Sequence, residues 1–384
     1  MPVKVLSVFG TRPEAIKLAP VIRALRARPE DFTCRLCVTS QHRELLQPAL
    51  KLFALQPDYD LAVMQADQSL SSLTARVLTG LEPVLAREQP DWVLVQGDTT
   101  TTLAASLAAF YARIPVAHVE AGLRSRDPWQ PYPEEINRCL TDALASLHFA
   151  PTDGARDNLL AEGIPEARIR VTGNTIIDAV QEVAARPYDR TRSPLSGLPL
   201  DGRRVVLVTA HRRENFGPPL RHLCQAIERL ATLHPDTLHV VFPVHLNPNV
   251  QQPVQRALGG CPNISLLAPL DYESFVHLMK RTTLILTDSG GLQEEAPALG
   301  VPTLVLRNVT ERPEGVAAGS ARVVGTEPEA VVAAATRLLS DPQDYAQMAR
   351  SRHPYGDGHA GERIVAALLE FSRDQELAPA IKSG

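Results

Sequence analysis

Short apolar runs alternate with helically spaced apolar positions along the first half of the chain. The runs have the length and the Val, Ile and Leu content of buried parallel strands, and they predict strands at residues 3–9, 33–39, 92–96, 115–120, 146–150 and 169–172. Between them, apolar residues recur with helical spacing, notably at 14–26, 71–88 and 101–113. Repeated β–α units favour a mostly parallel sheet covered by helices on both faces.

The same alternation starts again in the second half. A helix at 176–185 leads into a stretch rich in Pro, Arg, Ser and Gly at 186–202, which is typical of a linker, and strands are then predicted at 205–209, 239–242, 264–267, 284–287 and 303–306. In the last helix Ile364, Leu368 and Phe371 share one apolar face. We therefore expect an α/β protein with two Rossmann-like, doubly wound parallel-sheet domains and a ligand cleft at the C-terminal ends of the strands.

Composition narrows the classes of partner. The formal charge of −4 over 384 residues shows no basic excess, so nucleic acid is not an expected partner. No apolar run is long enough to span a membrane, and Met1 and Pro2 lead straight into a strand-like run without a signal peptide. The five scattered cysteines fit a reducing cytoplasm. No His, Cys and Asp set has the spacing of metal ligands.

The stretch 283–300 combines a buried strand, a glycine turn and the start of a helix. The turn Ser289-Gly290-Gly291 would bring free backbone N–H groups and the positive end of a helix together, which is an arrangement that attracts phosphate. Glu294 or Glu295, in the first turn, could reach a ribose hydroxyl. The alternative is an ordinary β–α turn with a stabilising acidic residue.

Basic residues follow the first strand of the chain. Arg12 and Lys17 beside a helix N-terminus would form a strong anion site, with Pro13 in the first helical turn and Thr11 as a cap. The alternative is a capped helix with solvated charges.

Carboxylates follow three other predicted elements. Asp98 comes after the strand 92–96, Glu120 closes the strand 115–120, and Glu134 opens a helix next to Glu135. Asp98 could serve only as a cap, and the two helical glutamates only as partners of the helix dipole. Burying Glu120 without a partner would be costly, which favours a functional role. Three carboxylates at one sheet edge would allow proton transfer to and from carbon.

Histidines follow two strands of the second half. His211 precedes Arg212 and Arg213, and this setting is better explained by a phosphate than by a structural histidine. His245 follows the next strand and could act similarly. The residues alone thus indicate a two-domain enzyme for a phosphorylated, nucleotide-linked ligand, but their spacing does not define the reaction.

Nine segments, taken in order, resemble the non-hydrolysing UDP-N-acetylglucosamine 2-epimerases. They read GTRPEAIK (10–17), QGDT (96–99), HVEAGLR (118–124), PEEINR (133–138), VTGNT (171–175), HRREN (211–215), PVHLNP (243–248), TDSGGLQEEAP (287–297) and TERPEG (310–315). The resemblance covers nearly the whole chain. It implies the GT-B type of fold, with residues 1–172 and a returning C-terminal helix at 360–376 forming one domain and residues 173–359 forming the UDP-binding domain.

The resemblance also implies a reaction. Members interconvert UDP-GlcNAc and UDP-ManNAc without a metal or nicotinamide cofactor, as homodimers that take a UDP-sugar substrate. They eliminate UDP to give 2-acetamidoglucal and then add it back with protonation on the opposite face. By matching position, Asp98, Glu120 and Glu134 become the acid/base carboxylates in an unassigned order, and His211 becomes a stabiliser of the departing diphosphate.

Substrate contacts are implied in both halves of the chain. Glu295 would hold the ribose and Phe275 would lie against the uracil. The full implied binding set is Arg12, Lys17, Arg138, His245, Phe275, Ser289, Gly290, Gly291, Glu295 and Arg312.

Many bacterial relatives also bind a second UDP-GlcNAc as an activator. The residues that could serve such an allosteric site here are Gln41, His42, Glu135 and Arg212. Glu44 and Asp67, however, are acids where the family pattern has an amide and an Arg. We keep activation as a hypothesis, which a hyperbolic UDP-ManNAc rate curve without added UDP-GlcNAc would contradict.

Three other functions compete with this interpretation. A hydrolysing epimerase would release ManNAc and UDP. A retaining glycosyltransferase of the same fold would need an acceptor. A catalytically inactive UDP-sugar sensor would not need the carboxylates at Asp98, Glu120 and Glu134.

Overall fold

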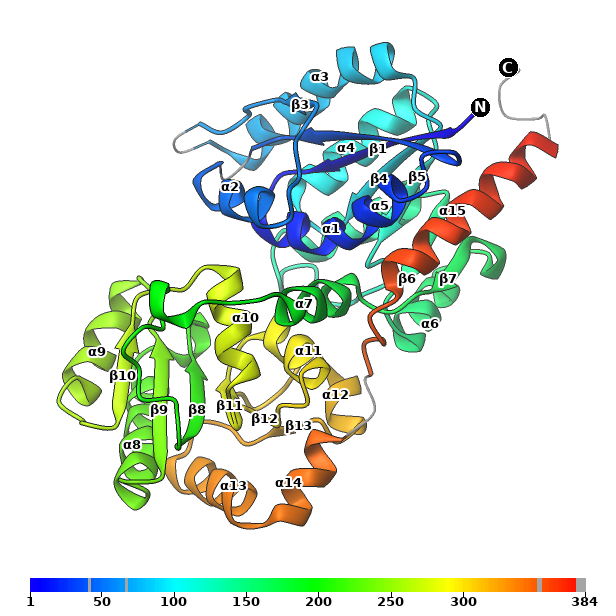
Figure 1. The fold of residues 1–384 in the computed structure, drawn as a ribbon. Coiled ribbons are helices and arrows are strands. Elements are labelled where there is room, and N and C mark those ends of the chain that lie inside the picture. The colour runs from blue at the N-terminus through cyan, green and yellow to red at the C-terminus, as the bar shows by residue number, and fades with distance from the viewer. Residues whose placement is uncertain (41–42, 66–67, 351–353, 378–384) are drawn as a thin grey trace. The chain divides into compact units, whose positions relative to one another are not determined.

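The computed structural model describes residues 1–40, 43–65, 68–350 and 354–377. It divides the chain into two compact units (Figure 1). The first unit comprises Met1–Ala179 and the segment that begins at Gly356, and the second comprises Val180–Tyr355. Each unit contains one parallel β-sheet covered by helices, so the predicted architecture of two doubly wound α/β domains is confirmed.

The sheet of the first unit has the strand order β3-β2-β1-β4-β5-β6-β7 in the described part of the chain. Its strands are β1 (Val3–Phe9), β2 (Phe32–Val38), β3 (Tyr59–Asp60), β4 (Trp92–Gln96), β5 (Val116–Val119), β6 (Leu147–Ala150) and β7 (Ile169–Val171). β1 and β4 are neighbours although β2 and β3 lie between them in sequence, so the strand order reverses there. Ligands of open α/β sheets bind at such switch points.

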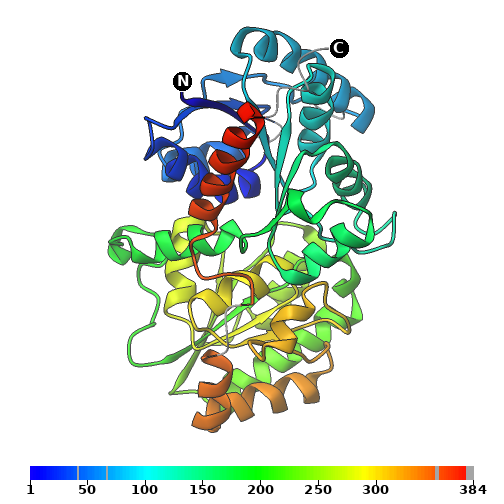
Figure 2. The same cartoon turned by 90° about the vertical axis from the view of Figure 1, so that its right-hand side faces the viewer.

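Helices cover both faces of this sheet. They are α1 (Arg12–Arg26), α2 (Arg43–Leu52), α3 (Leu70–Glu88), α4 (Thr100–Tyr111), α5 (Glu134–Leu144), α6 (Asp153–Ala161), the short η1 (Glu166–Arg168) and α15 (Ala360–Leu377). A further helix, α7 (Thr175–Ala185), begins in the first unit and ends in the second. α15 packs against α1 (Figure 2), and its first amides are capped by Asp178, which accepts from the N–H groups of Ala360 at 3.2 Å and Gly361 at 2.8 Å. The end of the chain therefore completes the first unit.

The sheet of the second unit has the order β10-β9-β8-β11-β12-β13 among the described residues. Its strands are β8 (Arg204–Thr209), β9 (Leu238–Pro243), β10 (Ile264–Leu267), β11 (Leu284–Thr287), β12 (Thr303–Val305) and β13 (Ala321–Val323). Its helices are η2 (Arg190–Arg192), η3 (Arg213–Asn215), α8 (Pro218–Leu233), α9 (Pro248–Leu258), α10 (Tyr272–Lys280), α11 (Gly290–Ala298), α12 (Pro313–Ala317), α13 (Pro328–Ser340) and α14 (Pro342–Ala349).

The sequence pattern located the central strands but missed two at the edges. β1, β4 and β11 begin and end at the predicted residues, because a strand buried on both faces consists mostly of apolar residues. β3 and β13 are the outermost strands of their sheets. They contain two and three residues and carry a polar side chain each, so they leave no apolar run to detect.

Candidate functional site

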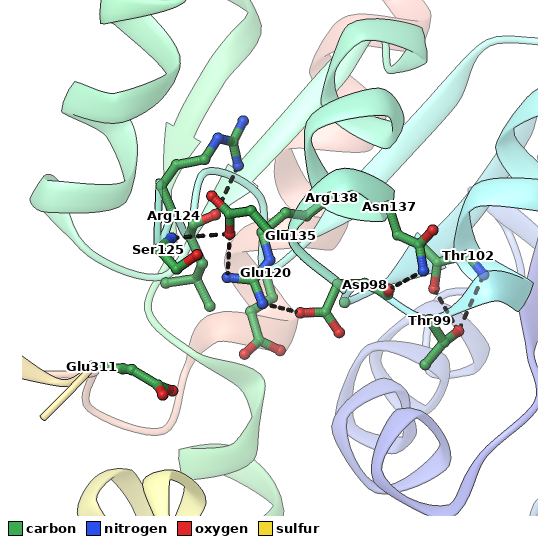
Figure 3. Close-up of polar contacts among 12 residues, drawn as sticks. Asp98, Thr99, Thr102, Glu120, Arg124, Ser125, Glu135, Asn137, Arg138 and Glu311 are labelled. Atoms are coloured by element: carbon green, nitrogen blue, oxygen red, sulfur yellow. Dashed lines mark hydrogen bonds and ion pairs between the residues drawn. The ribbon is translucent and has the colours of Figure 1, made fainter. Parts of the chain in front are cut away.

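Three β–α turns of the first unit end at the same edge of its sheet. The turns follow β1, β4 and β5, which are adjacent strands. The C-terminal ends of parallel strands meet at one edge of a sheet. Lys17, Asp98 and Glu120 therefore lie in one region although they are far apart in sequence. We call Lys17, Asp98, Glu120, Glu134 and Glu135 the carboxylate cluster. Figure 3 shows Asp98, Glu120 and Glu135 of this cluster.

Glu120 is the most enclosed of the three predicted catalytic carboxylates. Only 8% of the residue is exposed, and its backbone has a φ of +68°, which is unusual for a residue with a side chain. Lys17 contacts both carboxylate oxygens, at 2.7 and 2.5 Å, and the amide of Gln96 donates to Oε2. The ammonium group offsets the cost of burying the carboxylate. Lys17 and Glu120 therefore form one charged unit, which the sequence had not paired.

Asp98 is held from two sides by α5. Arg138 Nη2 lies 2.5 Å from its Oδ2, and the side-chain amide of Asn137 donates to its main-chain carbonyl at 2.9 Å (Figure 3). About a third of the Asp98 side chain remains exposed, at 30%. Glu134 is the first residue of α5 and is half-buried. The carboxylate of Asp98 is thus anchored yet accessible, as an acid/base group requires.

Glu135 holds the loop that follows β5. Its oxygens accept from the backbone N–H of Ser125 at 2.9 Å and of Arg126 at 2.7 Å (Figure 3), and Arg138 Nη1 lies 3.4 Å from its Oε2. The residue is buried. Sequence reasoning had offered Glu135 for an allosteric site, and the structure shows a carboxylate that orders the loop between β5 and α5.

Sequence reasoning missed the buried carboxylate of Glu14. It accepts from the N–H groups of Gly10 at 2.9 Å and Thr11 at 2.7 Å, and from the hydroxyls of Thr99 at 2.6 Å and Thr102 at 3.1 Å. Burial raises the pKa of Glu14 against the opposing effect of these bonds. The residue joins the turn after β1 to the turn after β4. The signal for it was the capping-box spacing Thr11-x-x-Glu14.

We expect Gly122→Ala to lower the free energy of unfolding of the first unit by about 3 kcal/mol, from a left-handed backbone and overpacking together. Gly122 has a φ of +86°, and a Cβ there would lie 2.2 Å from the carbonyl oxygen of Ala155. Gly163→Ala is the matched control, because its φ is +84° with nothing within 4 Å, and it should cost about 1 kcal/mol.

Urea denaturation followed by tryptophan fluorescence measures both glycine variants. Trp92 and Trp129 both lie in the first unit, so the signal reports on that unit. Equal losses of unfolding free energy in the two variants would show that the clash with the Ala155 carbonyl does not destabilise Gly122→Ala.

The second unit has a buried carboxylate of its own at the end of β11. Asp288 accepts from the backbone N–H of His211 and of Arg212, each at 2.9 Å, and from the side-chain amide of Asn215 at 3.0 Å. Its other oxygen lies 3.2 Å from His211 Nδ1. Burial acts to raise the pKa of Asp288, but the hydrogen bonds and charge of His211 lower it below its usual value. Asp288 therefore orients the loop and the ring of His211.

The orientation of His211 leaves its Nε2 directed away from Asp288. The imidazole is about two-fifths exposed and stacks on His245, with ring centroids 5.8 Å apart. His245 Nδ1 accepts from the N–H of Asn247 at 3.1 Å, so its proton resides on Nε2. The Nε2 edge of His245 is therefore a hydrogen-bond donor that is available to an anion.

The predicted glycine turn and helix start at residues 289–291 are present in the second unit. α11 begins at Gly290 with Ser289 as its N-cap residue, and Ser289 N–H donates to Thr287 Oγ1 at 2.9 Å. Among the two predicted acidic residues, Glu294 is buried against Arg312, and Glu295 is half-buried.

The remaining predicted positions are less defined by contacts. Phe275 is half-buried in α10, and Arg12 is exposed at the start of α1. The Arg212 side chain lies 3.7 Å from Glu311. Gln41 and His42 lie outside the described residues.

Neither a metal site nor a membrane-spanning helix is found among the described residues. Among the described residues, no group of three His, Cys, Asp or Glu side chains is placed to hold a metal ion. In the same part of the chain, no helix is both long enough and apolar enough to cross a membrane.

Comparison with known proteins gives one consistent result. Residues 23–369 match the family model described as UDP-N-acetylglucosamine 2-epimerase. The UDP-N-acetylglucosamine 2-epimerase of Escherichia coli K12 is 54% identical over 370 residues, which cover 95% of this chain and 98% of that protein. The crystal structure of UDP-GlcNAc 2-epimerase from Neisseria meningitidis bound to UDP-GlcNAc is 47% identical with a TM-score of 0.87, and the match covers 96% of this chain and 100% of that one.

A solved structure with much lower sequence identity has a similar fold. The glycosyltransferase of kitacinnamycin is 15% identical with a TM-score of 0.63, over 96% of this chain and 99% of that one. At this identity the likeness concerns the fold alone. Together with the two parallel sheets, it confirms the predicted GT-B type of fold.

Proposed function

The chain belongs to the UDP-N-acetylglucosamine 2-epimerase family, and on that premise we propose that it converts UDP-GlcNAc reversibly to UDP-ManNAc without hydrolysis. The substrate class is supported by the N. meningitidis relative, whose structure contains UDP-GlcNAc. The observation that carries the proposal is the carboxylate cluster, where Glu120 and Asp98 are each anchored by a basic side chain at the end of adjacent strands.

The proposed reaction must overcome an unreactive C–H bond. The C2 proton has no adjacent carbonyl to make it acidic, so direct removal and return is unfavourable. Elimination instead passes the C2 proton to a carboxylate while the C1–O bond breaks and its electron pair leaves with UDP, which gives 2-acetamidoglucal. Addition of the UDP oxygen to C1, with a proton delivered to the opposite face of C2, then yields the epimer.

The roles divide between the two units. Asp98, Glu120 and Glu134 of the first unit would carry the proton transfers, for which positioned carboxylates are suited. In the second unit, His211 and the start of α11 would stabilise the diphosphate, whose negative charge grows as the C1–O bond breaks. The anchoring of His211 by Asp288 supports this role, because it presents the ring in one orientation.

Proton NMR in deuterated water tests the proposal. We expect purified protein with UDP-GlcNAc to produce UDP-ManNAc up to an equilibrium mixture, with deuterium at C2 of both sugars. Solvent deuterium enters because the removed proton exchanges before a proton is returned to C2.

Other outcomes of the same experiment have distinct meanings. Free ManNAc with an equal amount of UDP would replace the proposal by a hydrolysing epimerase. An epimer without deuterium at C2 would contradict proton exchange at the carboxylates. An unchanged spectrum would contradict the epimerase activity itself. It would favour the glycosyltransferase or the UDP-sugar sensor instead.

A further inference from the structure

A chain of hydrogen-bonded side chains links His118, Asp142, Arg124 and Glu162 next to the carboxylate cluster. His118, in β5, places Nδ1 2.6 Å from Asp142 Oδ1 and Nε2 2.7 Å from the carbonyl oxygen of Gly97. Asp142, in α5, accepts from Arg124 Nη2 at 2.7 Å through its other oxygen. Arg124 in turn donates to both oxygens of Glu162, each at 2.7 Å. His118 and Asp142 are essentially unexposed, at 0% and 1%.

The hydrogen bonds hold the ring of His118 between two partners. The Gly97 carbonyl can only accept, so Nε2 of His118 carries the proton of that bond. Nδ1 forms the bond to Asp142. Burial acts to raise the pKa of Asp142, but the charge and hydrogen bond of His118 and the charge of Arg124 lower it to about 2.

The other titratable groups around Asp142 are His148 and Cys139. His148 Nε2 lies 2.9 Å from the main-chain carbonyl of Asp142, and burial lowers the pKa of His148, which favours the neutral ring. Burial also raises the pKa of the Cys139 thiol. Arg124 and Glu162 complete the surroundings, and the charges next to Asp142 are those of His118 and Arg124.

The pair joins the two turns that carry predicted catalytic groups. Gly97, whose carbonyl His118 holds, immediately precedes Asp98. Asp142 Oδ2 also accepts from the N–H of Gly122 at 3.2 Å, two residues after Glu120. Moving either member would shift the backbone beside Asp98 or Glu120, and displacements of about 1 Å in a catalytic group can cost about 100-fold in rate.

We infer that His118 and Asp142 are positioning residues for the epimerisation, acting through the Gly97 carbonyl on Asp98 and through the Gly122 amide on Glu120. The inference rests on the proposed function for its kinetic consequence. Neither residue needs to touch the substrate, and the sequence singled out neither one.

Two substitutions of His118 separate the two bonds. The amide nitrogen of a Gln side chain can take the place of Nε2, so His118→Gln keeps a donor for Gly97 and loses the bond to Asp142. The amide nitrogen of Asn can take the place of Nδ1, so His118→Asn keeps the bond to Asp142 and loses the one to Gly97. Both variants place an uncharged amide at this position, and His118→Asn is one methylene smaller than His118→Gln.

We expect His118→Asn to lower kcat about 100-fold and His118→Gln about 10-fold, with KM for UDP-GlcNAc changed less than about threefold in both. Each variant loses one buried hydrogen bond, and His118→Asn also leaves the larger cavity, so its thermal midpoint should fall further. A purely structural role would leave kcat equal in the two variants at temperatures well below both thermal midpoints. That outcome, or kcat within twofold of the unmodified protein for both, would overturn the inference.

A second measurement does not depend on activity. In protein labelled with ¹⁵N-histidine, the signal that disappears in His118→Gln should show a proton on Nε2, which is donated to the Gly97 carbonyl. An Nε2 without a proton would overturn the bond through which His118 acts on Asp98. If the unmodified protein fails to epimerise UDP-GlcNAc, the proposed function fails, and this spectrum still decides whether the bond to Gly97 exists.

Discussion

Glu120→Gln is expected to lower kcat about 10³-fold, within the range that positioned acid/base groups contribute, while UDP affinity stays within about twofold. Gln keeps the size of the side chain and can still bond to Lys17 and Gln96, which contact Glu120 in the structure. It cannot take up a proton. Initial rates of UDP-ManNAc formation by NMR, together with UDP titration calorimetry, separate the chemical step from nucleotide binding.

The control for this variant is Glu166→Gln. Glu166 lies in η1 of the same unit and is exposed, so the identical chemical change should leave kcat unaltered. If Glu120→Gln keeps kcat within tenfold of the unmodified protein, Glu120 is not an acid/base group and the carboxylates at Asp98 and Glu134 must account for both proton transfers.

Asp288→Ala is expected to destabilise the second unit by about 4 kcal/mol, because removing one partner of a buried charged network leaves its donors without an acceptor. The donors are the amides of His211 and Arg212 and the side chain of Asn215. UDP binding should weaken as well, since His211 loses its anchor. Asp288→Asn retains one carbonyl oxygen and should cause about half of the loss of stability.

The measurement must report on the second unit. Both tryptophans lie in the first unit, so fluorescence does not serve here. Hydrogen exchange by mass spectrometry at increasing denaturant, read on peptides from β8 and β11, gives the opening free energy of this sheet. Unchanged protection of β8 in Asp288→Ala would show that the carboxylate does not hold the loop.

The pH dependence of the same variants has a defined sign. Asp288 has a folded-state pKa below its unfolded value, so its stabilisation is present above an unfolded pKa of about 3.9 and is lost as the pH falls through the folded pKa. The stability difference between the unmodified protein and Asp288→Asn should therefore shrink below about pH 4. A difference that keeps its full size below that pH would contradict the assignment.

The local pattern of the chain was sufficient for the architecture and for the location of the candidate groups. Mostly apolar runs predicted β1, β4 and β11 to the residue, because parallel strands that are buried on both faces carry few polar side chains. Residues directly after such runs, such as Asp98 and Glu120, must then lie at the C-terminal edge of a sheet. These inferences need only neighbours in sequence.

The partners of those groups were decided by the tertiary structure alone. Lys17 meets Glu120 across 103 positions, and His211 N–H meets Asp288 across 77. A period of two or of 3.6 residues describes which face a side chain occupies, and it contains no information on which distant residue lies opposite. Buried polar groups are the exception to the apolar pattern, and most of them are stabilised by specific hydrogen bonds. For this reason the sequence could indicate Glu120 as a costly buried carboxylate, whereas the buried roles of Glu14 and Asp142 required the assembled fold.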